Sequence, residues 1–412
     1  MTGLDSTPTP RLYHRAADLP DVAPLLAGEV LYAKPDWLAY CEASAGGRIR
    51  HVVLEDAAGR AVAMATYRIV PDENVLSLYD LSSLLPAPPA GDAPGSAGSN
   101  AAKEPLRAAK SLVFPNAVGA VSGAHCVLLT DSGADPATRS ALRRALVRAV
   151  AQHAAQEGCD TVGFLYLRDR DSAQDVAEAL GDACAAPFPV AAQMQLAGGW
   201  PDFEGYLATL PSPRRNKIRR ERKQFLEAGI LTRAVPGTVA LDEDTARLQL
   251  ALRRRYGAGG TTASILADYE HLHASVEERV LVFRCEREGR LVGVSLALLD
   301  GDHLHVRLAG FDYGALAADF AYFNAVYYEP VRWGIEHGIT RYSFGTGTYG
   351  AKLARGCRPS LLWGAVLWPA ELREAAAAAT AERGAALLTS LGLAPASDPP
   401  AGADDRIQGA HR

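Results

Sequence analysis

The sequence is poor in cysteine, and its few cysteines lie far apart with no Cys-x-x-Cys pair among them. Their six positions are Cys41, Cys126, Cys159, Cys184, Cys285 and Cys357. Structural zinc sites and disulfide frameworks need clustered cysteines. We therefore expect reduced thiols that are scattered as small apolar residues, and no metal site.

Long apolar runs are also missing. No stretch approaches the roughly 18 consecutive apolar residues that a membrane-spanning helix requires. The first residues, Met1 to Pro8, contain no basic region followed by an apolar run, which a secretion signal would need. These features predict a cytoplasmic protein without a membrane span, and they leave the oligomeric state open.

The sequence has no large excess of one charge: its net charge is −5 over 412 residues. This balance excludes a uniformly basic nucleic-acid binder, so any contact with a polyanion must be a local patch. With about 100–200 residues per domain as the usual range, this length predicts two domains.

Familiar catalytic signatures are missing too. The sequence contains no GxxxxGK[ST], HExxH or GxSxG motif. Gly345-Thr346-Gly347 follows an expected strand but lacks the third glycine of a dinucleotide-binding loop. We therefore expect no cofactor.

The sequence indicates the same order of secondary-structure elements twice. Alternating and helical apolar periods predict a hairpin, a strand, a helix and a strand in each copy. In the first copy these are residues 49–70, 125–130, 136–156 and 161–167, with a further strand near 111–114. In the second copy they are residues 279–299, 303–310, 319–337 and 339–344. The repetition predicts a duplicated α/β module.

Composition sets the expected boundaries. Segments rich in Pro, Gly, Ala and Ser have little to bury and are expected to be flexible. The predicted division is a disordered lead-in at 1–10, an N-terminal module at 11–198 with a flexible insertion at 86–105, a basic junction at 199–229, a C-terminal module at 230–393 and a disordered tail at 394–412.

The junction contains a strongly basic helix, predicted at residues 213–228 with Ser212 as its N-cap and Gly229 at its end. Seven cations and one glutamate fall within the ten residues 214–223. Like charges one turn apart repel, so such a helix suits an anionic partner, although a solvated face is the alternative. The candidate phosphate-binding residues are Arg214, Arg215, Lys217, Arg219 and Arg220.

A glycine-rich loop at Gly345–Gly350 precedes Lys352 and Arg355. Only six of the 42 basic residues are lysines, so the lysine here indicates a need for a compact ammonium group. Loop N–H groups and a nearby cation suit a developing oxyanion. A surface loop with two solvated cations is the alternative.

Several of these motifs resemble a known family. They are Tyr327-Tyr328, Ile335-Glu336-His337-Gly338, Lys352-Leu353-Ala354-Arg355-Gly356 ending at Pro359, the arginine-rich run at 214–222, and Arg307-Leu308-Ala309-Gly310. Over roughly residues 200–368 the chain is similar to the GNAT-superfamily group of Fem-type peptidyltransferases and related peptidoglycan biosynthesis/recognition proteins. The fold implied is α/β, with two tandem GNAT-like modules, each a mixed twisted sheet flanked by helices.

The resemblance implies transfer of an aminoacyl group from aminoacyl-tRNA to an amine of a small-molecule or peptide acceptor, in a cleft between the modules. A lysine placed like Lys352 contacts the RNA end of the donor, and Arg355 joins the basic helix as a phosphate ligand. The catalytic candidates are Lys352, Arg307, Asp312, His305 and Tyr349, with His303 on the same strand face as His305. The candidates for the acceptor cleft are Tyr327, Tyr328, Asn324, Gly345, Thr346 and Gly347.

Two alternatives remain open. An acyl-CoA could be the donor, although residues 310–318 lack the Arg/Gln-x-x-Gly-x-Gly/Ala loop that binds pyrophosphate in ordinary GNAT enzymes. The protein could instead be a non-catalytic RNA-binding module. For the transferase, we expect the basic helix and the Lys352 loop to face one cleft.

Overall fold

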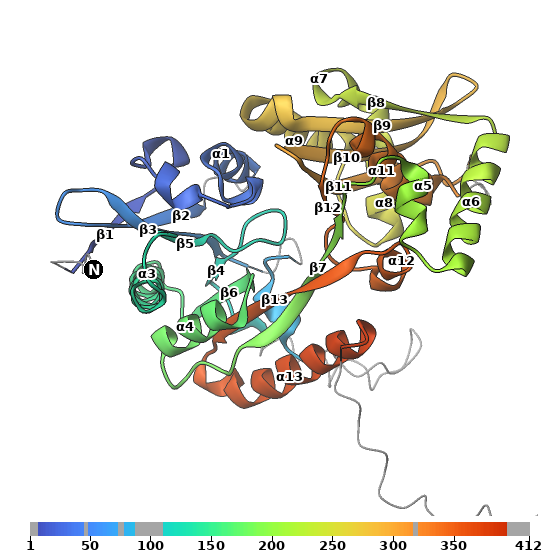
Figure 1. The fold of residues 1–412 in the computed structure, drawn as a ribbon. Helices are drawn as coiled ribbons and strands as arrows, with labels where there is room; N and C mark the ends of the chain where they lie inside the picture. The colour runs from blue at the N-terminus through green and yellow to red at the C-terminus, as the bar shows by residue number, and fades with distance from the viewer. Residues whose placement is uncertain (1–6, 45–47, 73–77, 87–109, 316–319, 394–412) are drawn as a thin grey trace, which may run out of the picture.

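The computed structural model describes residues 7–44, 48–72, 78–86, 110–315 and 320–393. Its strands form one mixed sheet of thirteen strands with helices on its faces, as Figure 1 shows. The strand order is β1-β2-β3-β4-β6-β13-β7-β12-β11-β10-β9-β8, and β5 pairs with β3. Only the pairs β4–β6 and β11–β12 are parallel among the described strands. The predicted α/β class is confirmed.

The elements of the first half are β1 (Thr9–Tyr13), α1 (Pro35–Ser44), β2 (Ile49–Glu55), β3 (Ala61–Val70), β4 (Asn116–Gly119), β5 (Leu128–Thr130), α3 (Pro136–Gln156), β6 (Thr161–Leu167), α4 (Arg170–Leu180) and β7 (Phe188–Ala197). The junction holds α5 (Phe203–Ala208) and α6 (Ser212–Glu227). The second half has β8 (Ile230–Pro236), α7 (Gly237–Ala240), α8 (Glu243–Arg255), α9 (Thr262–Val276), β9 (Val280–Arg287), β10 (Arg290–Asp300), β11 (His303–Phe311), α10 (Ala321–Phe323), α11 (Glu329–Glu336), β12 (Arg341–Ser343), α12 (Tyr349–Leu353), β13 (Arg358–Leu367) and α13 (Arg373–Ser390).

The long helix α3 illustrates how local signals produce these elements. Asp135 caps it by accepting from the N–H groups of Ala137 and Thr138, and Pro136 occupies its first position. Leu142, Leu146 and Val150 follow at four-residue steps and are buried in a core shared with β2, β3 and β6. The helix is held by this apolar stripe, because most helical stability in proteins comes from such packing.

The last strand of the sequence connects the two halves of the sheet. β13 lies between β6 and β7, although it follows β12 in the chain. β7 pairs with β13 on one side and with β12 on the other (Figure 1). The boundary between the modules stays a prediction, but strands from both halves of the sequence meet at the centre of the sheet.

Most elements that the periodicity predicted are present, with some corrections. The strand near 111–114 was wrong, because β4 begins only at Asn116. Thr9 and Pro10 pair with β2 and so do not belong to a disordered lead-in. Ser212 does not cap α6, since the helix starts at that residue and Pro211 stands before it. Residues 87–105 of the predicted insertion and the tail from 394 lie outside the described residues.

The predicted helix at 319–337 is interrupted. It consists of α10, a π-helical segment at Asn324–Tyr328, and α11. A π-helical turn inside a helix is uncommon and is often found at functional sites. The interruption changes which side chains of this stretch reach the interior of the protein.

All six cysteines are free, and five of them are buried. In the part of the chain that the structure describes, no helix has both the length and the apolar character needed to cross a membrane.

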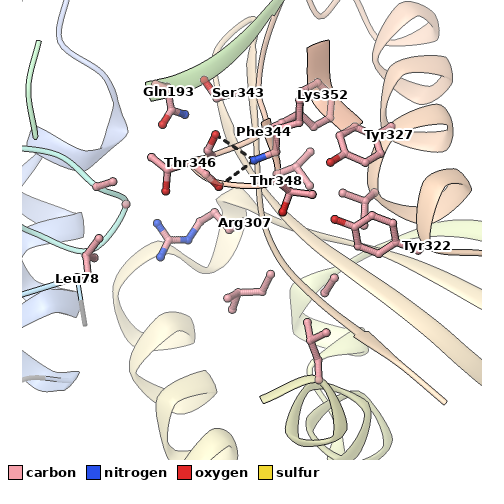
Figure 2. Close-up of a pocket in the computed structure, with 18 of the residues that line it drawn as sticks. Leu78, Gln193, Arg307, Tyr322, Tyr327, Ser343, Phe344, Thr346, Thr348 and Lys352 are labelled. Carbon is pink, nitrogen blue, oxygen red and sulfur yellow. Dashed lines mark hydrogen bonds between the residues drawn. The ribbon is translucent and has the colours of Figure 1, made fainter. Parts of the chain in front are cut away.

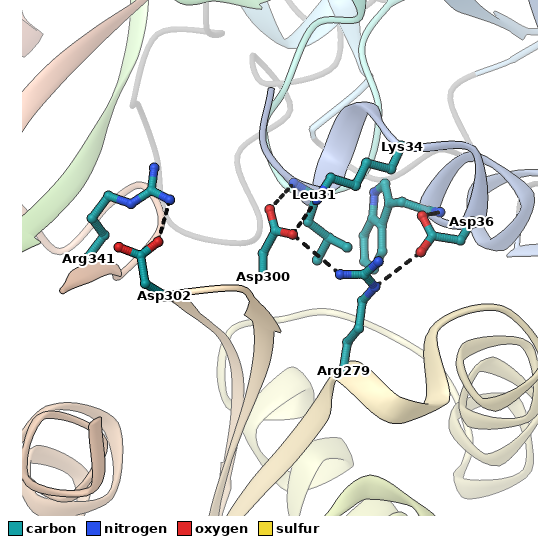
Figure 3. A network of polar contacts seen from close by, with 8 residues as sticks. Leu31, Lys34, Asp36, Arg279, Asp300, Asp302 and Arg341 are labelled. Atoms are coloured by element: carbon teal, nitrogen blue, oxygen red, sulfur yellow. Dashed lines mark hydrogen bonds and ion pairs between the residues drawn. The ribbon is translucent and has the colours of Figure 1, made fainter. Parts of the chain in front are cut away.

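A network of charges joins the first half of the chain to the second (Figure 3). The carboxylate of Asp300, at the end of β10, accepts from the backbone N–H of Leu31 at 2.8 Å and from the ammonium of Lys34. Arg279 bridges the same carboxylate at 3.3 Å and Asp36 at 3.1 Å. The Asp300 side chain is only 10% exposed, so these contacts are poorly screened by solvent.

Changing Asp300 to Asn is therefore expected to lower the free energy of unfolding by about 2–3 kcal/mol, because Lys34 and Arg279 lose their shared counter-charge. Asp302→Asn is the matched control, since Asp302 pairs with Arg341 at the surface, where both side chains are about half exposed. Its cost should stay below about 1 kcal/mol. Urea denaturation measures both, and equal losses would contradict a special role for Asp300.

Candidate functional site

The candidate site lies where two neighbouring strands diverge. β11 and β12 pair in parallel only from His303 opposite Arg341 to His305 opposite Ser343. Beyond this point β11 continues to Phe311, whereas the chain after Ser343 bends to β7, and the N–H of Phe344 donates to the Met194 carbonyl at 2.9 Å. A cavity of about 360 Å³ fills the gap between them (Figure 2).

A bulge in β11 sets the direction of Arg307. Val306 pairs with Ala297 and Leu308 with Leu296, which leaves Arg307 as an extra residue in the strand. Bulges of this kind redirect a side chain and are frequent beside active sites. The Arg307 guanidinium lines the cavity, as Figure 2 shows, and donates to the Ser122 hydroxyl at 2.9 Å.

The glycine-rich loop forms the opposite wall and holds Lys352. Gly345 and Gly347 have φ angles of 69° and 73°, a left-handed backbone that favours glycine, and Thr348 adopts 48°. This turn aims two carbonyls inward, and the Lys352 ammonium donates to those of Gly345 at 3.2 Å and Thr346 at 2.9 Å (Figure 2). Lys352 is 5% exposed, and burial lowers its pKa to about 8. Its ammonium is thus a stronger acid than that of an ordinary lysine.

The interrupted helix supplies aromatic side chains to the same cavity. Tyr327 comes from the π-helical segment and Tyr322 from α10, and their hydroxyl ends face the cavity in Figure 2. Tyr256, just after α8, also lines it and is 78% exposed. A pocket with apolar walls and a few convergent polar groups is typical of a ligand site.

A second, smaller cavity of about 260 Å³ adjoins the first. The two share lining residues, namely Tyr32, Gly123, Ala124, Gln193 and Ser343. The second cavity adds three histidines, which are His125, His303 and His305, and one cation, Arg168. No aspartate or glutamate is among the described residues that line either cavity. The combined space therefore suits a ligand with negative charge.

Several residues predicted for the site are brought together here. Lys352, Arg307, Tyr327, Gly345 and Thr346 line the larger cavity, and His305 lines the smaller one. The parts of the lining that come from β11 and from the glycine-rich loop therefore lie in segments that the sequence indicated. Their roles in catalysis stay predictions.

Two predicted catalytic residues lie elsewhere. Asp312 accepts from the N–H of Gly314 at 3.1 Å and pairs with Arg290 at 2.5 Å, so it closes a turn and lines neither cavity. The hydroxyl of Tyr349 accepts from the N–H of Ala192 at 3.2 Å, and this side chain also lies outside both linings. The structure does not support either residue as a general base.

Arg355 is buried in an ionic cluster, contrary to the prediction that it binds phosphate. Its guanidinium contacts Glu221 of α6 at 2.9 Å and the Tyr328 hydroxyl at 2.9 Å, and it lies 3.7 Å from the Phe323 ring centroid. Asn324 packs beside this cluster, with its side-chain amide donating to the Phe320 carbonyl at 3.0 Å. These groups bond to one another. Arg355, Tyr328 and Asn324 therefore support the packing of α6 on α12 and do not line the cavities. Gly347 also lies outside both linings.

The basic helix α6 does not face the cavity of Lys352, so the expectation of a common cleft was wrong. None of its residues is in either lining. Its exposed cations are Arg214, Lys217, Arg219, Arg220 and Lys223, while Arg215 is half-buried and donates to the Leu210 carbonyl at 2.7 Å. Arg219 pairs with Glu204 of α5 and lines a separate groove between α5 and α6.

Sequence reasoning missed most of the wall contributed by the first half of the chain. Tyr32, Gly123 and Ala124 lie in segments without a motif. Gln193 and Gln195 were detectable, because they alternate with the buried residues of β7 in the period of a strand. The omission of β7 therefore concealed one whole side of the cavities.

Comparisons with known proteins agree with this architecture. A family described as peptidoglycan biosynthesis/recognition (FemAB-like) matches residues 124–384. A search of curated proteins found no match. Among solved structures, FemX is 11% identical, with 83% of this chain and 93% of that chain covered and a TM-score of 0.52.

Two further structures are similar at lower scores. The C-terminal domain of a putative lysylphosphatidylglycerol synthetase from Agrobacterium fabrum is 11% identical, covers 90% of this chain and 97% of its own, and has a TM-score of 0.49. A tandem GNAT protein from the clavulanic acid biosynthesis pathway is 12% identical, covers 88% and 100%, and has a TM-score of 0.48. At these identities a likeness in structure concerns the fold alone.

The family match spans more than half of the sequence and includes the Lys352 loop, β11 and α6. The chain therefore belongs to the FemAB-like family of peptidoglycan biosynthesis/recognition proteins, the Fem-type acyltransferase group that its motifs resemble.

Proposed function

We propose that this protein transfers an aminoacyl group from aminoacyl-tRNA to an amine of a small-molecule or peptide acceptor, forming an amide bond. The observation that carries the proposal is the Lys352 ammonium, held by a glycine-rich loop at the cavity where β11 and β12 diverge. The absence of acidic side chains from the cavity linings and membership of the Fem-type family support it. Since charged tRNA is made in the cytoplasm, the reaction is placed there.

The chemistry needs positive groups more than it needs a strong base. The acceptor amine attacks the ester carbonyl of the donor, a C–N bond forms and the C–O bond to the terminal ribose breaks. The proton released by the amine ends on the ribose oxygen, and the transient oxyanion is stabilised by fixed donors. Lys352 and Arg307 are the cations at the cavity, and a lysine with a pKa near 8 is suited to give a proton to the leaving oxygen.

The exposed cations of α6 are proposed to hold the backbone of the tRNA outside the cavity. Glu221 and Arg355 tie α6 to α12, the helix that carries Lys352, so RNA held by α6 is anchored close to the loop. Salt-dependent phosphate contacts of this kind position a nucleic acid without reading its sequence.

Replacing Arg214, Lys217 and Arg220 together with Ala should weaken tRNA binding at least tenfold at low salt, because three exposed cations are removed. The slope of log affinity against log salt should become shallower by roughly two to three. A filter-binding titration at several salt concentrations measures this slope. The control is a triple variant in which Arg233, Arg247 and Arg254, elsewhere in the second half, are replaced with Ala. It should leave the tRNA affinity and the salt slope unchanged. An equal loss in the control would refute a specific role for α6.

The donor is tested by offering alternatives side by side. The protein is incubated with a pool of charged tRNA, with acyl-CoAs, or with neither, in the presence of a small-molecule extract, and amide products are followed by mass spectrometry. Product with charged tRNA alone supports the proposal. Product with acyl-CoA alone assigns the other donor, and tRNA binding without any product assigns an RNA-binding module.

A further inference from the structure

Three buried histidines of the smaller cavity have ring nitrogens without a hydrogen-bond partner. His305 is 2% exposed, and both of its nitrogens are unpartnered among the described residues. His303 and His125 are each 5% exposed and leave Nδ1 and Nε2 unpartnered, respectively. Buried polar atoms are nearly always paired, and leaving one unpaired costs about 1–3 kcal/mol. These nitrogens therefore indicate that the cavity receives a polar guest.

The histidines form one polar wall. His303 and His305 stand two residues apart on β11, and their ring centroids are 3.8 Å apart. The Ser343 hydroxyl lies 2.8 Å from His303 Nε2, and the Tyr32 ring lies 5.0 Å from that of His305. At 260 Å³ the space is larger than a single water, whose share of liquid volume is about 30 Å³, so it has room for a ligand group.

Another part of the lining comes from β7 and the end of β6, and it opens to solvent. Gln193 is half-buried, whereas Gln195 and Arg168 are exposed at the mouth of the cavity. Gln193 also lines the larger cavity, so one molecule can reach from the histidines to the Lys352 loop. A ligand bound in the histidine cavity can therefore extend into the proposed reaction site.

The charges restrict what the guest can be. No acidic side chain is among the described lining residues, which disfavours an amine at this end. Arg168 is the single cation in the lining, and it already pairs with Glu29 at 3.1 Å. A phosphate dianion requires more positive charge than this, whereas one carboxylate requires less and can be bound mainly by imidazole and amide N–H donors.

We propose that the histidine cavity binds a carboxylate of the acceptor and so leaves the acceptor amine in the adjoining cavity beside Lys352. This inference deepens the proposed function and rests on it for the identity of the guest as the acceptor. The acceptors it defines are amino acids and short peptides with a free carboxylate close to the reacting amine.

The protonation of the histidines agrees with binding and opposes a role as general base. Burial lowers the pKa of His303 to about 4 and that of His125 to about 3, and it holds the pKa of His305 well below its usual value. Neutral imidazoles can each donate one N–H to a carboxylate, but they take up a proton from an amine poorly at pH 7. A bound carboxylate would raise these pKa values, so binding at mildly acidic pH should be accompanied by proton uptake. The titratable or charged groups that act on His305 are His303, Arg307, Arg341 and His125, and the Tyr32 ring packs against it.

The test uses calorimetric titration of the full chain with free amino acids, the matching C-terminal amides and inorganic phosphate, each in two buffers of different ionisation enthalpy. At least one acid should bind ten or more times tighter than its amide and tighter than phosphate, with net proton uptake at mildly acidic pH. His305→Asn should weaken binding of that acid at least tenfold, while the exposed control His14→Asn should not change it. Arg168→Ala, at the exposed mouth, should weaken it severalfold and serves if the first variant fails to fold.

The outcomes separate this inference from the proposed function. Equal binding of acids and amides, preference for phosphate, or no binding of any acid, which would leave the cavity holding water only, would each overturn the carboxylate site. Selective acid binding without amide formation from charged tRNA would retain the site and remove the proposed function. Turnover that prefers amides over acids would retain the function and remove the site.

Discussion

Replacing Lys352 with Ala is expected to reduce amide formation from charged tRNA at least tenfold while the fold is retained. The side chain donates to two loop carbonyls and presents the ammonium at the cavity, and the variant removes that charge from the reacting carbonyl. Fixed electrostatic donors of this kind are worth about 10²–10³ in turnover in other acyl-transfer enzymes. Single-turnover rates with saturating charged tRNA measure the effect, and an unchanged rate would exclude Lys352 from the site.

The pH dependence follows from the lowered pKa of Lys352, which is about 8. The ammonium is present below that pH, so the wild-type rate should fall as the pH rises through about 8. Lys352→Arg supplies the test, because arginine stays charged: its lower residual rate should not show this fall. A wild-type rate that keeps rising to pH 9.5 would contradict a requirement for the ammonium.

The same lysine should reduce stability. Because the folded-state pKa of Lys352 is below the ordinary lysine value of 10.5, the unfolded chain binds more protons between about pH 8 and 10.5, so stability rises with pH over this window. Below pH 8 the buried ammonium costs about 3 kcal/mol by this linkage. Lys352→Met should accordingly unfold at higher urea concentration than wild type at pH 7, and by a smaller margin at pH 9.5. Inactivity combined with gained stability would separate a functional role from a structural one.

Arg355→Ala is expected to lower the free energy of unfolding by about 3–5 kcal/mol, the usual cost of removing one partner from a buried ion pair. Glu221 is fully buried and Arg355 is 5% exposed, so the variant leaves the buried Glu221 carboxylate with the more distant Lys217 ammonium, 4.0 Å away, as its counter-charge. The contact with the Tyr328 hydroxyl and the packing on Phe323 are lost as well. Urea denaturation measures the change.

The controls separate charge from geometry. Arg355→Lys keeps the charge but cannot reach Glu221, Tyr328 and the Ala351 carbonyl together, so it should retain only part of the stability. Arg219→Ala, on α6, removes the exposed partner of Glu204 of α5 and should cost far less stability than Arg355→Ala. If Arg355→Ala costs no more than Arg219→Ala, the cluster does not secure α6 to α12.

The sequence predicted those parts of the fold that carry their signal locally. Helix α3 has its own cap, proline and apolar stripe, and β2 and β3 are short apolar runs on either side of a turn, so both were placed correctly. β13 was missed because its place between β6 and β7 is decided by pairing with distant strands, which no local pattern records. The π-helical segment was missed because its residues keep an ordinary helical period, so the sequence pattern does not distinguish it from an α-helix.

The sequence predicted only part of the candidate site. Lys352 and the glycine loop stand out because the chain has so few lysines and because a left-handed turn requires glycine. Arg355 lies in the same motif, but charge alone does not reveal that Glu221, far away in the sequence, takes up its guanidinium. The tertiary fold likewise decides that no residue of α6 lines either cavity.

The transfer of an isotopically labelled amino acid tests the central claim most directly. The label is placed on tRNA, a single turnover is run with wild type and with Lys352→Ala, and the label is followed into an amide by mass spectrometry. The account predicts that wild type moves the label from the tRNA into an amide and that the variant does so at least ten times more slowly. The proposal would be contradicted if the label remained on the tRNA or were released only as the free amino acid. It would also be contradicted if an acyl-CoA supplied the amide instead.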